Sequence, residues 1–111
     1  QSLLTMYNLN NIFPKPSWYR SAAVTDQRLT VDNTAGGVQF STFNDTSTMI
    51  VLDVQDADVM VTFDGSAPTS TNGHRLYTGS HYTWSVAAAQ QAKFIRQGAA
   101  NAAIHASEFQ L

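Results

Sequence analysis

The sequence predicts an all-β protein: a single antiparallel β-sandwich of seven to eight strands with an extended N-terminal arm. From residue 23 onward, short runs of β-branched and aromatic residues alternate with turn-forming Gly, Asn, Asp and Pro, which is typical of antiparallel sheets. Charged residues make up only 13% of the chain, about half the ~25% usual in soluble domains. Ten serines and twelve threonines supply much of the polarity. The 111 residues suit one globular domain.

Residues 1–24 form the predicted arm and residues 25–111 the sandwich. The arm contains Leu3, Leu4, Met6, Tyr7, Leu9, Ile12, Phe13, Trp18 and Tyr19. Asparagines and the Pro14-Lys15-Pro16 step interrupt any regular period there, so an extended chain is expected. Side chains this apolar are expected to be buried, against either the arm's own domain or a neighbouring subunit. For the second case, the expected interface anchors are Leu9, Ile12, Phe13, Trp18 and Tyr19.

The first half of the sandwich is predicted to hold three strands. Residues 24–33 form a strand that ends at a tight turn at Gly36-Gly37. Residues 38–43 are predicted to return as the next strand. Residues 48–55 are the most apolar run, with apolar side chains on both faces. They are therefore predicted to be the central strand, covered on both sides.

The second half begins with a half-buried strand over residues 59–64, which alternates apolar and other side chains. Residues 66–73 are turn formers and predict a surface loop. Further strands are predicted within residues 76–86, 93–96 and 102–111. Residues 87–92 favour helix but are too few for more than one turn. The predicted core includes Val51, Val59, Val61, Phe63, Phe94 and Ile104.

Candidates for catalysis and metal binding are weak. Four carboxylates fall close enough along the chain to suggest Ca²⁺, although turn aspartates are common for backbone hydrogen bonding alone. They are Asp53, Asp56, Asp58 and Asp64. His74, His81 and His105 lack the spacing of a zinc site on one element. No Gly-x-Ser-x-Gly nucleophile and no glycine-rich phosphate loop is present. We expect no enzymatic activity, no metal and no cofactor.

Charge and hydropathy also limit the classes of partner that are expected. The formal net charge is −2, and the six Lys and Arg residues are scattered, so nucleic-acid binding is not expected. No apolar stretch approaches the ~18 residues of a membrane helix, so no membrane is expected either. The chain has no cysteine and therefore no disulfide or thiolate site.

Three aromatic residues are candidates for glycan contact. Tyr77, Tyr82 and Trp84 could stack on sugar rings if they were exposed together. Tyr82 and Trp84 share a face at alternating spacing, and that arrangement also fits packing in the core. Both interpretations are open at the level of sequence.

The segment from residue 59 to residue 70 resembles the Asp-Gly-Ser-x-Pro-Thr hairpin of chitobiase C-terminal-like sandwiches, which implies an immunoglobulin-type fold. The hairpin residues are Asp64, Gly65, Ser66, Pro68 and Thr69. The chain is also similar to short bacteriophage virion proteins, in which such a hairpin precedes Gly-His and a Lys-Phe-Ile-Arg strand. Here these are Gly73-His74 and residues 93–96.

The resemblance implies a non-enzymatic structural protein located in the virion. A capsid decoration or cement protein is the first expectation, because an arm-bearing, nearly neutral domain can bridge capsid subunits by apolar contact. The alternatives are a head-to-tail or neck component, a tail or fibre subunit, or a carbohydrate-binding adhesin module. The expected partners are other virion proteins, with the chain itself a homo-oligomer or present in many copies.

Overall fold

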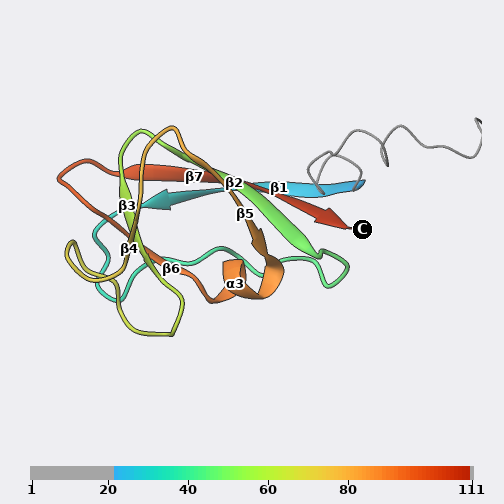
Figure 1. Cartoon of the computed structure of the whole chain (residues 1–111), viewed down its shortest axis with the longest axis horizontal. Helices are drawn as coiled ribbons and strands as arrows, with labels where there is room; N and C mark the ends of the chain where they lie inside the picture. The colour runs from blue at the N-terminus through green and yellow to red at the C-terminus, as the bar shows by residue number, and fades with distance from the viewer. Residues whose placement is uncertain (1–21, 111) are drawn as a thin grey trace, which may run out of the picture.

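The computed structural model describes residues 22–110 and confirms an all-β antiparallel sandwich (Figure 1). Its elements are β1 (Ala22–Val31), β2 (Met49–Gln55), β3 (Val59–Thr62), β4 (His74–Leu76), β5 (His81–Ser85), α3 (Val86–Gln91), β6 (Lys93–Arg96) and β7 (Ala102–Gln110). One sheet has the order β1-β7-β2-β5 and the other has the order β4-β3-β6. The predicted arm and its anchors Leu9, Ile12, Phe13, Trp18 and Tyr19 lie outside the described residues.

The central strands of the larger sheet are β2 and β7. The prediction that residues 48–55 lie centrally is confirmed, but β2 is not covered on both sides. Ile50, Leu52 and Val54 are at most 1% exposed, whereas Val51 on the opposite face is only half-buried. Placing Val51 in the core was therefore wrong, because only one face of this sheet packs against the other sheet.

Strand β3 is the centre of the smaller sheet and is buried at all four positions. The prediction of a half-buried strand was wrong here. On the second face, the chain folds back over the strand, and the Thr62 hydroxyl donates to the Ser66 carbonyl at 2.6 Å. Phe63 follows β3 and is half-buried against the core rather than enclosed in it.

The predicted strand over residues 38–43 is reduced to one bridge, between Val38 and Phe94. The turn before it forms as predicted, with positive φ at Gly36 and Gly37. Beyond the bridge, side-chain amides bind the backbone in place of a neighbouring strand. The Gln27 side chain exchanges two hydrogen bonds with the Ser41 backbone. The Gln90 side chain accepts from the Phe43 amide at 2.9 Å and donates to the Phe40 carbonyl at 3.5 Å.

The helix α3 spans six residues and so exceeds the single turn that was expected. Ser85 caps its N-terminus, with the hydroxyl oxygen accepting from the Ala88 amide at 3.2 Å. Ala89 is fully buried, as is Ala92 just after the helix, so small side chains let the helix pack closely on the core. This burial stabilises a helix that is too short to persist alone.

The core lies between the two sheets. Its fully buried members include Val31, Ile50, Val59, Val61, Phe94 and Ile104, and the last four of these confirm their sequence-based assignment. Phe40 and Phe43 close one side, with the Phe40 ring 5.4 Å from both the Phe43 and Phe94 rings.

Candidate functional site

The turn at Asp64 is held by its own side chain. Asp64 Oδ1 accepts from the Ser66 amide at 3.0 Å and from the Ser66 hydroxyl at 2.6 Å. These bonds, the hydroxyl one first, lower the pKa of the Asp64 carboxyl below its usual 3.8. Gly65 supplies the positive φ of 86° that the turn requires. The Asp-Gly-Ser order thus builds a fixed corner at the end of β3.

The rest of the loop folds back on itself through Thr69. Its hydroxyl accepts from the Asn72 amide at 2.9 Å, and its backbone amide donates to the Asn72 carbonyl at 3.1 Å. Most of residues 66–73 are exposed, as predicted for a surface loop. Pro68 is the exception: it is fully buried, next to Gly37. The proline therefore anchors the loop to the body of the sandwich.

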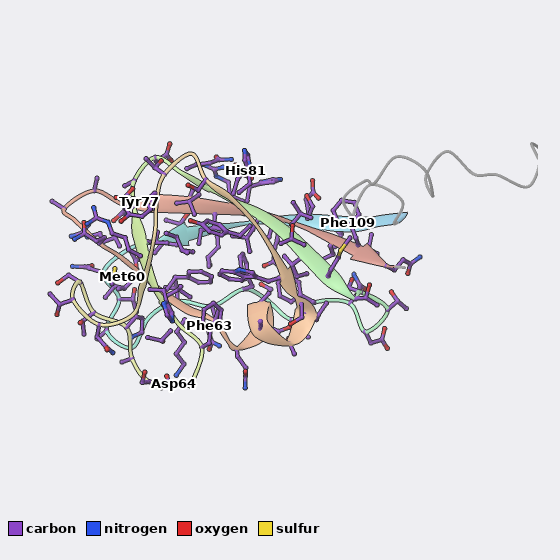
Figure 2. The ribbon with its side chains drawn as sticks, in the orientation of Figure 1. Met60, Phe63, Asp64, Tyr77, His81 and Phe109 are labelled. Carbon is purple, nitrogen blue, oxygen red and sulfur yellow. The ribbon has the colours of Figure 1, made fainter. Side chains whose placement is uncertain are left out.

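A pocket of about 470 Å³ lies beside this loop and is lined by residues from its two ends. Its lining consists of Val61, Thr62, Phe63, Asp64, Ser66, Asn72, Gly73 and His74. Four of these, Asp64, Ser66, Asn72 and His74, are exposed polar residues. Figure 2 shows Phe63 toward the interior and Asp64 at the outer end of the loop. The pocket thus combines an aromatic inner wall with a polar rim, as ligand pockets commonly do.

Gly73 keeps the two sides of the pocket together. Its φ is 130°, and a Cβ there would lie 2.7 Å from the Val61 carbonyl oxygen. Only glycine lets the returning chain approach β3 this closely. The next residue, His74, starts β4 opposite Val61. The Gly-His pair noted in the sequence is therefore where the loop rejoins the sheet.

A column of aromatic rings connects the pocket with the core. Trp84 stacks on Phe94, with the ring centroids 6.1 Å apart. Phe63 meets Trp84 edge to face at 5.0 Å, and the His74 ring lies 6.1 Å from the Phe63 ring. Of the residues considered for glycan contact, Tyr82 and Trp84 are thus half-buried against the core. Tyr77 lies apart from them, 56% exposed beneath the Arg75 guanidinium.

The four aspartates considered for calcium have separate partners. Asp58 accepts from Arg75 at 2.7 Å and from the Thr78 amide at 2.8 Å. Asp53 accepts from the Gln55 amide group, and Asp56 lies 3.6 Å from Arg28. Within residues 22–110, no group of three or more His, Asp or Glu side chains could hold a metal ion.

The histidines are also dispersed. His74 lines the pocket, whereas His81 and His105 lie in the other sheet, on either side of Asp53 in the strand register. His105 Nε2 lies 3.4 Å from Asp26 Oδ2. Figure 2 shows His81 far from Asp64.

The described chain contains no helix long and apolar enough to cross a membrane.

No family model, curated protein or solved structure matches the chain. The geometry of the described residues and the resemblance of the hairpin therefore carry the functional argument. Sequence reasoning singled out the hairpin but missed Phe63, Asn72 and His74 as parts of one pocket. The signal that could have located them is the Asn-Gly-His run, because a glycine there lets the chain return to the strand it left.

Proposed function

We propose that this protein is a non-enzymatic structural subunit of a bacteriophage particle. In its simplest form it is a capsid decoration protein that cements neighbouring subunits through its sandwich and its N-terminal segment. The hairpin and the Lys-Phe-Ile-Arg strand, which resemble virion proteins, support this role. In the structure, these two segments are adjacent: the Lys93 ammonium donates to the Gly65 carbonyl at 3.0 Å.

The observation that carries the proposal is that the described residues form a buried core of their own. The buried cluster of the described chain runs from Val31 to Ala106 and draws on both sheets and the helix. We infer that the large apolar side chains within residues 3–19 serve a second surface, that of a neighbouring subunit. Full burial of each large side chain stabilises by roughly 1.5 to 3 kcal/mol, so such a segment can hold subunits together.

The arrangement of the polar groups supports a non-enzymatic role. A serine nucleophile needs a base that accepts its proton and a third group that orients the base. The Ser66 hydroxyl instead donates to Asp64, within the turn that both residues build. The Asp64 carboxylate is thus engaged in holding the loop.

The test of assembly uses the full chain with Phe13→Ser and Trp18→Ser combined. We expect this variant to keep a β-type circular dichroism spectrum and the thermal stability of the parent. Its oligomers and its attachment to purified particles should be lost, because the interface loses two large anchors. The matched control is Tyr77→Ser, which removes an exposed aromatic ring from the sandwich and should leave assembly unchanged. An unfolded double variant, together with a monomeric parent, would place these anchors in the chain's own core and overturn the proposal.

Electron microscopy can test where in the particle the protein lies. Antibodies against the sandwich, bound to purified particles and viewed by electron microscopy, should decorate the capsid surface. Label confined to the neck or tail would support the structural role and replace decoration with a head-to-tail or tail role. Particles that carry no label would contradict the virion assignment altogether.

A further inference from the structure

The pocket at the β3–β4 loop has hydrogen-bonding groups that the fold leaves unused. Asp64 binds Ser66 through Oδ1, and its Oδ2 takes no partner from the described residues. Asn72 uses its amide NH₂ to donate to the Ala67 carbonyl at 3.3 Å, which leaves its Oδ1 available. The two ring nitrogens of His74 likewise have no partner within residues 22–110. These three side chains, all with unused donors or acceptors, line the same space of about 470 Å³.

These groups are held in place before any ligand arrives. Two bonds from Ser66 fix the Asp64 carboxylate, and the Asn72 backbone is tied to Thr69 in both directions. Phe63 is supported by Trp84, which stacks in turn on the fully buried Phe94. A preorganised pocket loses little entropy when a small ligand binds.

The charges around the pocket favour a neutral ligand. The Asp64 carboxylate is ionised at neutral pH, as an aspartate of ordinary pKa is, so it repels phosphate, sulfate and other anions. The Lys93 ammonium reaches the same loop from β6, where it donates to the Gly65 carbonyl, and it opposes the entry of a cation. A purely apolar ligand would leave the carboxylate and the Asn72 amide without partners, which is unfavourable once water is displaced.

We propose that this pocket binds a neutral sugar residue, with the C–H face of the ring against Phe63 and hydroxyl groups held by Asp64, Asn72 and His74. A sugar has an apolar face beside rows of hydroxyls, and the pocket offers one aromatic side chain, Phe63, beside the polar side chains of Asp64, Asn72 and His74. This assignment is independent of the virion role and differs from the set Tyr77, Tyr82 and Trp84. A subunit on a particle surface could hold glycans in this way, whatever its position in the particle.

The test is a nuclear magnetic resonance titration of the full chain with methyl glycosides of glucose, galactose, mannose and N-acetylglucosamine. At least one glycoside should bind in the millimolar range and shift the amide signals of residues 63–66 and 72–74. Asp64→Asn and His74→Ala should each weaken that binding about tenfold, the effect of losing one good hydrogen bond to the ligand. Asn at position 64 still has an Oδ1 that accepts from Ser66, so the loop should stay folded.

The matched controls are Asp45→Asn and His81→Ala, which change an exposed aspartate and an exposed histidine away from the pocket. Both should bind the sugar as the parent does. Binding that is equally weak in pocket and control variants overturns the proposal, as does the absence of binding by every glycoside. A parallel titration with methylguanidinium that shifts the same amides, while no sugar does, would assign the pocket to a cationic side chain instead.

Discussion

At the scale of single residues, glutamine side chains complete the backbone hydrogen bonding where a strand is missing. Gln27 reaches Ser41 from β1, and Gln90 reaches Phe40 and Phe43 from α3. A primary amide has both a donor and an acceptor, so it can imitate the edge of a strand. The segment that carries the two core phenylalanines is therefore held without joining a sheet.

Replacing Gln90 tests this role. Gln90→Ala leaves the Phe43 amide, which is partly buried, without its acceptor. The free energy of unfolding should fall by roughly 1 to 3 kcal/mol, as for other unpaired buried donors. The control is Gln91→Ala, an exposed neighbour in the same helix, which should change stability by less than about 0.5 kcal/mol. Urea unfolding of both variants gives the comparison, and equal losses would contradict the role of Gln90.

At the scale of elements, some boundaries could be read from the sequence and others could not. The strand at residues 93–96 and the tight turn at Gly36-Gly37 follow local patterns of side chains and glycine. The strand predicted at residues 38–43 failed because its partners are side chains 14 and 47 positions away. The periodicity of apolar residues indicates which side of a segment is buried. It does not indicate which distant group forms hydrogen bonds with the backbone N–H and C=O groups.

The candidate site also has one part that could be predicted from the sequence and one part that could not. The corner at Asp64-Gly65-Ser66 is local chemistry and was predictable from its order. The pocket was not predictable, because it needs the loop to return at Gly73 and an aromatic wall supported by Trp84 from the other sheet. The complete burial of β3 similarly depends on its neighbours rather than on its own alternation.

The return at Gly73 makes a direct prediction for the loop. Gly73→Ala forces a side chain onto a φ of 130° and against the Val61 carbonyl oxygen. Strain of this kind is worth roughly 1 to 3 kcal/mol, so thermal unfolding should begin several degrees lower. Gly98→Ala is the control, since a Cβ there meets nothing within 4 Å. If calorimetry found the two variants equally stable, the close approach of the loop to β3 would be wrong.

At the scale of the whole molecule, four aspartates act as small clamps around the sandwich. Each has its pKa lowered chiefly by one hydrogen bond. The donors are the Ser107 hydroxyl for Asp26, the Thr34 hydroxyl for Asp32, the Thr78 amide for Asp58 and the Ser66 hydroxyl for Asp64. The clamps join β1 to β7, tie the residue before β3 to the segment between β4 and β5, and close two local turns, so their ionisation bears on the stability of several parts of the fold.

Their direction of shift sets the response to acid. A carboxyl with a lowered pKa in the folded state stabilises that state at any pH above the pKa of the unfolded chain, here about 3.8. Stability should therefore be level from pH 7 to about pH 5 and decline as the pH falls below about 4. Asp58→Asn should flatten the decline. Denaturant midpoints measured across this range would refute the clamps if they rose toward low pH.

The position of β7 between β1 and β2 also affects how the protein can be made. On a ribosome, the first strand of this sheet emerges about eighty residues before the strand that separates it from β2. The larger sheet cannot close until residues 102–110 have left the exit tunnel, so the apolar faces of β1 and β2 remain without their partner strand until then. Such non-local pairing is slow and leaves nascent chains prone to aggregation. We therefore expect chaperones that shield β1 and β2 during synthesis to raise the yield of folded protein.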